Sequence, residues 1–190
     1  MRDRMPPLPE DRMDEAQRRA AAALIAGPRK GVFGPFIPLM RSPELMDRLQ
    51  RVGEYLRFGN AKPARLNELA MLVTARHVTN QFEWAVHAPL AIKEGVDPAA
   101  IEAIARGRRP DGMPADDALV HDFCRELLST NEVSDATYER AVARLGERGV
   151  VDLVGTVGYF LAICLVMNVA GTPAPANGVP PLEPVAATRR

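Results

Sequence analysis

Apolar residues recur every three or four positions along most of this chain, which is the spacing of amphipathic helices. We find no sustained alternation of apolar and polar residues of the kind that marks a strand. Between breaks rich in Gly and Pro, the pattern predicts helices at about 13–26, 43–58, 64–78, 81–93, 98–106, 116–128, 135–145 and 147–167. The sequence therefore predicts an all-α protein, an orthogonal helical bundle of about eight helices.

Proline and glycine set several of the predicted helix ends. Pro43 and Pro98 each stand at a first helical position, where the missing backbone N–H is not needed. Gly146 is expected to end one helix before the last and longest one begins. Pro89 lies inside the helix predicted at 81–93, so we expect a kinked or loosened middle turn there.

The chain divides into three parts by composition. Residues 1–42 are predicted to hold one helix followed by an apolar loop rich in Gly and Pro, at 31–38. Residues 43–170 are predicted to form the helical domain. Residues 171–190 are rich in proline, and we expect an extended tail that either wraps a neighbour or stays mobile.

A nearly continuous apolar stretch at 150–170 has about the length of a bilayer span. Asp152 lies within it, and Gly155 and Gly158 lower its intrinsic helix stability. We therefore expect a buried or subunit-contact helix and no membrane span. The first residues lack the apolar core of a secretory signal, which favours a cytoplasmic location.

Composition narrows the class of protein further. The 190 residues suit one domain, and 24 basic residues balance 24 acidic ones. A formal net charge of zero argues against a nucleic-acid-binding protein, which usually carries a basic excess. Cys124 and Cys164 stand far apart among apolar residues, so both are predicted to be reduced core residues and not a dithiol centre.

The strongest candidate for chemistry is a pair of residues on the helix predicted at 81–93. Glu83 and His87 are four positions apart and share one face. Glu68 lies on the preceding helix, and an antiparallel hairpin would bring it near His87. Such a cluster suits acid–base catalysis, since imidazole titrates near neutral pH and a carboxylate fixes its tautomer. A surface Glu–His pair or a core histidine bonded to a backbone carbonyl would fit the same spacing. A metal site that also used His77 has weak spacing, so we predict no metal.

Other polar and aromatic residues are weaker candidates for substrate contact. His77 and Tyr159 each lie on an apolar face, where either a hydrogen-bonded core role or a pocket role is possible. Trp84 would either pack in the core or contact substrate. His121 starts a charged amphipathic helix and is expected to be solvated. Asn168 would satisfy a buried backbone group or point into the pocket.

Three segments together resemble the carboxymuconolactone decarboxylase family, whose helical core is shared by AhpD-like alkylhydroperoxidases. They are Arg65-Leu-Asn-Glu-Leu-Ala-Met-Leu72, Gln81-Phe-Glu-Trp-Ala-Val-His87 and Ala91-Ile-Lys-Glu-Gly-Val-Asp-Pro98. The resemblance covers about residues 43–107, including the Leu56-Arg-Phe-Gly59 turn, and implies an AhpD-like fold. Two later segments, 133–138 and 151–159, are similar to longer members of the family.

The resemblance separates two kinds of chemistry. The peroxidase branch has a glutamate, a CxxC pair and a histidine; Glu68 and His87 match the first and last of these. The cysteine positions fall on Asn80 and Glu83, so thiol peroxidase activity by that route is excluded. Glu83 and His87 instead resemble the Glu-x-x-x-His element of the decarboxylase branch, although Trp84 and the long C-terminal extension depart from the small decarboxylase.

The resemblance therefore implies a cofactor-free lyase that acts on a small carboxylic acid or lactone of aromatic degradation. It implies His87 as acid or proton shuttle, with Glu83 or Glu68 orienting it and Asn80 donating a hydrogen bond. An isomerase, a lactone hydrolase or a non-catalytic binding protein would fit the same scaffold. Family members form rings of subunits, so we expect a homo-oligomer, a trimer or hexamer.

Overall fold

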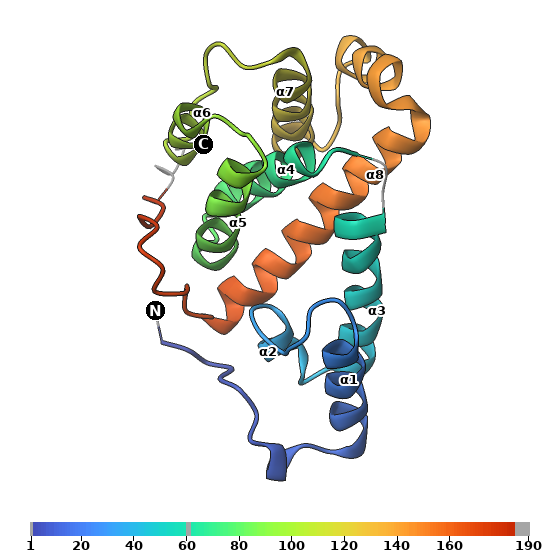
Figure 1. Ribbon diagram of the computed structural model, residues 1–190, viewed down its shortest axis with the longest axis vertical. Helices are drawn as coiled ribbons and strands as arrows, with labels where there is room; N and C mark the ends of the chain where they lie inside the picture. The colour runs from blue at the N-terminus through green and yellow to red at the C-terminus, as the bar shows by residue number, and fades with distance from the viewer. Residues whose placement is uncertain (1, 60–61, 185–190) are drawn as a thin grey trace.

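Helices form the regular structure throughout residues 2–59 and 62–184, the part of the chain that the computed structural model describes (Figure 1). The α-helices are α1 (Glu15–Ala26), α2 (Phe36–Leu39), α3 (Pro43–Glu54), α4 (Ala64–His77), α5 (Gln81–Lys93), α6 (Pro98–Ala105), α7 (Ala115–Thr130) and α8 (Asp135–Ala170). A short 3-10 helix, η1 (Glu10–Arg12), precedes them, and a π-helical turn, η2 (Tyr55–Gly59), follows α3. The all-α prediction with about eight helices is confirmed.

Local sequence explains where the helices differ from the prediction. Residues 36–39 form one helical turn, α2, inside the loop that we expected to be irregular. Gly146 leaves helical geometry with φ 68° and ψ 167°, so the span α8 consists of two helices joined by a sharp kink at the residue where the sequence predicts a helix end (Figure 1). Glycine adopts this positive φ without a side-chain clash, which is why the bend falls at this residue.

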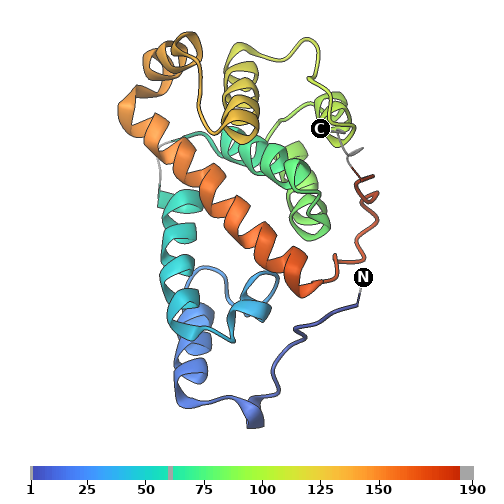
Figure 2. The ribbon, with the colours of Figure 1, turned by 180° about the vertical axis from the view of Figure 1, so that it is seen from behind.

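Helix α4 forms the centre of the molecule, as its apolar sequence predicts. Every residue from Leu66 to Arg76 is buried, and the helix packs against α5, α7 and α8. In both views α4 and α5 lie against the long diagonal of α8 (Figures 1 and 2). A polar side chain on the faces that α4 and α5 turn toward each other therefore needs a partner from the protein itself.

The N-terminal third forms a second, smaller core. Helix α1 packs on α3, and both lie below α4 and α5 in Figure 1. The buried apolar residues of this cluster are Ala20, Leu24, Phe36, Leu39, Met40 and Met46. The backbone N–H of Arg4 donates to the carbonyl of Ala170 (2.7 Å), which fixes the start of the chain beside the end of α8.

The C-terminal segment 171–184 packs along its own α5, where the sequence predicts an extended tail. The side-chain amide of Gln81 donates to and accepts from the backbone of Leu182, both at 2.8 Å. Asn177 Nδ2 donates to the carbonyl of Ala85 (2.8 Å). Pro89 lacks the N–H that would bond this carbonyl in a regular helix, so Asn177 replaces the missing donor. Helix α5 consequently runs unbroken through Pro89.

By length and composition alone, α8 could span a membrane. However, 56% of its most apolar stretch is buried inside the molecule, where the helix packs against α4. Core helices of water-soluble proteins pass the same test, so α8 is weak evidence for a membrane span.

Candidate active site

The hairpin of α4 and α5 places the candidate residues opposite one another. Only Val78 and Thr79 separate the last turn of α4 from Asn80, the N-cap of α5. Asn80 Oδ1 accepts from the backbone N–H of Glu83 (2.8 Å), which starts α5 at a fixed orientation. Thr79 has a φ of 51°, a conformation that β-branched residues rarely adopt. The tight turn folds α5 back along α4, and Glu68 meets His87.

Both ring nitrogens of His87 contact a carboxylate. Nδ1 lies 2.6 Å from Glu68 Oε2, and Nε2 lies 3.0 Å from Glu83 Oε2. Glu68 is 8% exposed, Glu83 is 4% exposed and His87 is 2% exposed. The arrangement is therefore a buried carboxylate–imidazole–carboxylate array, and neither a surface ion pair nor a histidine bonded to a backbone carbonyl.

The environment of His87 favours its charged form. Burial alone would lower the pKa of the imidazole, but the hydrogen bonds and charges of Glu68 and Glu83 outweigh burial and raise the pKa to about 9. At neutral pH His87 is consequently an imidazolium, with a proton on each nitrogen. It stands ready to act as an acid and not as a base.

A small cavity of about 50 Å³ opens beside one side of the array. Glu83 and His87 line it, whereas Glu68 lies behind the imidazole and does not. Phe160 of α8 contacts the His87 ring edge-to-face at 5.4 Å, and Tyr159 packs on Phe160 at 5.3 Å. The other residues that line the cavity are Arg29, Phe33, Pro35, Phe36, Arg57, Phe82, Val86 and Ile163.

The sequence analysis missed two of these lining residues, Arg29 and Arg57. Arg29 follows α1, and its guanidinium donates to the carbonyl of Gln50 (3.1 Å) and stacks over the Phe36 ring at 4.8 Å. Arg57 belongs to η2, a π-helical turn of the kind often found at functional sites. The sequence carried a partial signal, since each arginine stands next to a predicted loop or turn and close to apolar aromatic residues.

Gly53 of α3 makes room for this arrangement. A Cβ at that position would lie 2.2 Å from the Tyr159 hydroxyl oxygen and 2.7 Å from Arg29 Nη2. Both groups therefore reach their places because residue 53 has no side chain. Burial raises the pKa of Tyr159, although the nearby Arg29 opposes this, so the hydroxyl stays protonated at neutral pH.

Of the four residues expected to contact substrate, Tyr159 alone lines this cavity. Asn80 is buried and fully used by the fold, since Nδ2 donates to the Cys164 carbonyl and to Asn168. Trp84 packs in the main core under the C-terminal segment. His77 is exposed at the end of α4. Substrate contact by these three residues stays a prediction, and Asn80 and Trp84 line a separate groove of about 620 Å³ beside the C-terminal segment.

Two further polar residues are now placed. His121 was expected to be solvated, but it is buried, 3% exposed, with Nδ1 at 3.1 Å from Asp122. The prediction was wrong because α7 packs this face against α4 and the core. Asn168 hydrogen-bonds to a backbone group and does not line the cavity beside His87: its Nδ2 donates to the carbonyl of Val78 (2.9 Å).

The thiols lie away from the cavity. Cys124 and Cys164 are both free and buried. Burial raises the pKa of Cys124 to about 12, and it also raises the pKa of Cys164. Neither is a thiolate at neutral pH. Within residues 2–59 and 62–184, no group of three His, Cys, Asp or Glu side chains is arranged to hold a metal ion.

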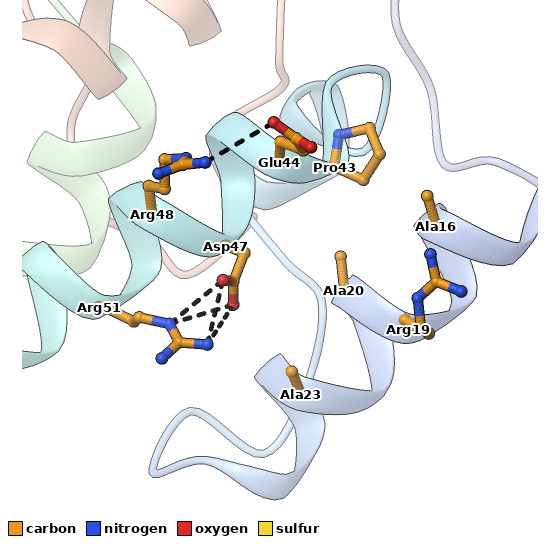
Figure 3. Close-up of a pocket in the computed structure, with 9 residues that line it drawn as sticks. All are labelled: Ala16, Arg19, Ala20, Ala23, Pro43, Glu44, Asp47, Arg48 and Arg51. Carbon is orange, nitrogen blue, oxygen red and sulfur yellow. Dashed lines mark hydrogen bonds and ion pairs between the residues drawn. The ribbon is translucent and has the colours of Figure 1, made fainter.

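A wider groove of about 620 Å³ lies between α1 and α3 (Figure 3). Its charged residues form ion pairs along α3, Arg51 with Asp47 at 3.1 Å and Arg48 with Glu44 at 3.8 Å. These side chains are mostly exposed, and such pairs contribute little to stability or recognition. The smaller cavity, with its buried and perturbed histidine, is therefore the better candidate site.

Comparison with known proteins agrees with this description. Residues 43–121 match the model of the carboxymuconolactone decarboxylase family, so the resemblance that the sequence carries is confirmed for this part of the chain. The fold is similar to a crystal structure of an alkylhydroperoxidase AhpD core, an uncharacterized peroxidase-related protein from Ralstonia eutropha JMP134. The TM-score is 0.74 at 14% identity, covering 93% of this chain and 94% of that one.

A second structure, an uncharacterized peroxidase-related protein from Silicibacter sp. TM1040, gives a TM-score of 0.72 with the same identity and coverage. Identity this low establishes a shared fold and leaves activity open. Among curated proteins no relative matches the sequence. The AhpD-like fold that the sequence predicts is confirmed.

Proposed function

We propose that this member of the carboxymuconolactone decarboxylase family is a lyase that needs no cofactor and acts on a small carboxylated lactone or a related acid. The buried Glu68–His87–Glu83 array would supply the proton. The observation that carries the proposal is an imidazole held by a carboxylate at each nitrogen, with one of its edges open to a cavity.

The geometry divides the roles of the two carboxylates. Glu68 makes the shorter contact with His87 and lies outside the cavity, which suits an orienting group that keeps Nδ1 protonated. Glu83 shares Nε2 at the cavity wall and is positioned to pass that proton onward. These contacts support Glu68 as the orienting group in the proposed mechanism.

The proposed reaction needs a proton donor and little else. When the C–C bond to the carboxylate breaks, carbon dioxide leaves and the electron pair delocalises onto the lactone carbonyl as a dienolate. The Nε2 proton of His87, directly or through Glu83, then transfers to carbon, and the array regains a proton from water. The aromatic wall of Phe82 and Phe160 excludes water and strengthens these electrostatic interactions.

A cavity of about 50 Å³ holds a few water molecules and not a whole lactone ring. Binding of such a substrate therefore requires movement of the lining loop that carries Phe33 and Pro35. Phe33 is half exposed, so its displacement costs little buried area. The names of the structural neighbours suggest peroxidase chemistry, but the buried, protonated thiols of this chain give that reading no support.

The test is turnover of carboxymuconolactone and related unsaturated lactone acids by the purified protein. We expect carbon dioxide release that falls when Glu83 is replaced, in Glu83→Gln, and persists in Glu44→Gln, an exposed control on α3. Mass-neutral rearrangement or addition of water would identify an isomerase or a lactone hydrolase on the same array. No conversion of any such acid would overturn the proposal and leave a binding protein.

A further inference from the structure

Two guanidinium groups converge on the cavity from separate parts of the chain. Arg29 comes from the segment after α1, and Arg57 from η2 at the end of α3. Arg29 lies outside residues 43–121, so the family domain does not supply it. Both arginines line the same small volume as Glu83 and His87.

Neither arginine is in ion-pair contact with a carboxylate of the described residues, although the charge of Glu54 acts on Arg29 from a greater distance. Among the ion pairs of residues 2–59 and 62–184, none involves Arg29 or Arg57. Arg29 is half-buried, and its hydrogen bonds go to neutral groups, the carbonyl of Gln50 and the hydroxyl of Tyr159. A partly buried cation without an anion is costly, and an anionic ligand would remove that cost.

The two cations also act on each other. Burial is the main cause that lowers the pKa of Arg29, while Tyr159 opposes it and the charge of Arg57 lowers it further. Like charges held together destabilise the empty protein, since each would gain by moving away. An anion between them turns this repulsion into two attractive contacts.

The array itself makes such cations necessary for an acidic substrate. The array sets two carboxyl groups against one imidazole, and this excess of acidic groups does not favour the approach of an anion. Arg29 and Arg57 add two positive charges at the same cavity, and these favour the approach of an acid to His87.

We propose that Arg29 and Arg57 bind a carboxylate of the substrate that is retained through the reaction, which makes the substrate class a small acid with at least one carboxylate besides any group that is lost. An ion pair with the departing carboxylate would stabilise the charge that decarboxylation removes, and so would slow the reaction. Arginine pairs suit a permanent carboxylate, which they hold in a fixed direction. The assignment of the retained group rests on the proposed function, whereas carboxylate binding by the two arginines does not.

Binding of unreactive acids tests the site without any turnover. The probes are acetate and benzoate, each compared with its neutral amide, acetamide or benzamide, by NMR titration of the whole chain. We expect at least one acid to bind the wild type more tightly than its amide. In Arg29→Gln the affinity for that acid should fall by about ten- to a hundred-fold, the effect of losing a charged hydrogen bond, with Arg57→Gln also weakened.

Two variants separate binding from folding and from overall charge. Arg29→Lys keeps the cation and should restore part of the affinity, and Arg48→Gln removes an exposed arginine of α3 and should bind as the wild type does. Equal affinity for acid and amide in the wild type would overturn the proposal. So would an acid affinity in Arg29→Gln equal to that of the Arg48→Gln control.

The results also distinguish the two proposals. Acid binding that depends on Arg29, in a protein without turnover, would remove the proposed lyase and keep the carboxylate site. If turnover depends on Glu83 but the Michaelis constant is unchanged in Arg29→Gln, the lyase is kept and the carboxylate site is removed. If both hold, Arg29→Gln should raise KM far more than it lowers kcat.

Discussion

Both faces of helix α5 carry polar groups, but the groups on one face bind ionisable partners and those on the other bind neutral partners. On the face toward α4 and α8, Glu83 and His87 pair with ionisable groups. On the face under the C-terminal segment, Gln81 and the carbonyl of Ala85 pair with backbone and amide groups. The first face holds charge that can change with pH. The second has hydrogen bonds between neutral groups, and these attach the C-terminal segment to α5.

The comparison teaches how to recognise a site within a buried helix. Asn80 and Trp84 lie close to Glu83 in sequence and were candidates for substrate contact, but their contacts are with the fold. The side-chain amide of Asn80 is bonded to the protein through both its oxygen and its nitrogen, which leaves it little capacity for a ligand. On the other face, Glu83 and His87 of the array line a cavity, so a ligand can still reach them.

The largest effect should come from His87. In His87→Gln the imidazole that donates the proton is gone, and we expect turnover to fall by about 10²- to 10⁴-fold, the usual contribution of a general acid. His77→Gln, at an exposed histidine outside the cavity, should retain wild-type turnover. Steady-state kinetics on both variants checks the difference, and equal rates would show that the inner face of α5 is structural too.

The same face should make stability depend on pH. The pKa of His87 is raised from about 6.5 to about 9, so its stabilising effect is complete below pH 6.5 and is lost as the pH rises through 9. The free energy of unfolding should fall by up to about 3 kcal/mol over that range. Urea unfolding across pH 6 to 10 measures this.

The double variant Glu68→Gln/Glu83→Gln is the matched comparison. Without the carboxylates, burial lowers the pKa of His87, so this histidine contributes stability that grows as the pH rises through about 6.5. The sign of the slope near neutral pH should therefore reverse. A wild type and a variant with the same slope would contradict the charged state that we assign to His87.

Gly53→Ala should disturb the cavity without touching the array. The new methyl group overlaps Tyr159 and Arg29, and we expect a loss of about 1–3 kcal/mol in unfolding free energy. Gly158→Ala on α8 has open space around it, so the gain in helix propensity should stabilise the protein by about 0.5–1 kcal/mol. Thermal unfolding of the two variants should shift in opposite directions.

The smallest effect should lie on the outer face. Asn177→Ala removes the donor to the Ala85 carbonyl, and we expect a loss of about 1 kcal/mol with turnover unchanged. Chemical unfolding and a rate assay on the same sample would test this. A large fall in rate with intact stability would mean that the two faces are coupled.

Most of the fold could be read from the sequence, because helix ends depend on local signals. The bounds of α5 agree with the prediction at both ends, and Gly146 produces a break in helical geometry where one was expected. Local pattern does not show which segment will cover a given face. The burial of His121 and the docking of residues 171–184 on α5 were missed for that reason.

Part of the site could also be predicted from local sequence pattern. Glu68, Glu83 and His87 belong to one hairpin, and helical spacing predicts their meeting. Arg29 and Arg57 reach the cavity because α1 packs on α3 and α3 packs against α8, and no spacing within the sequence relates them to His87. The catalytic roles proposed here remain predictions for the experiments above.

The bond between Asn177 and the Ala85 carbonyl has a consequence for how the chain is made. During synthesis, the α4–α5 hairpin leaves the ribosome long before residue 177 exists. Glu68 and His87, only 19 positions apart, can meet early, but the Ala85 carbonyl that Pro89 leaves without a donor must wait for Asn177. A chain cut short before Asn177 would then carry an assembled acid–base pair on a helix in which the Ala85 carbonyl lacks its donor.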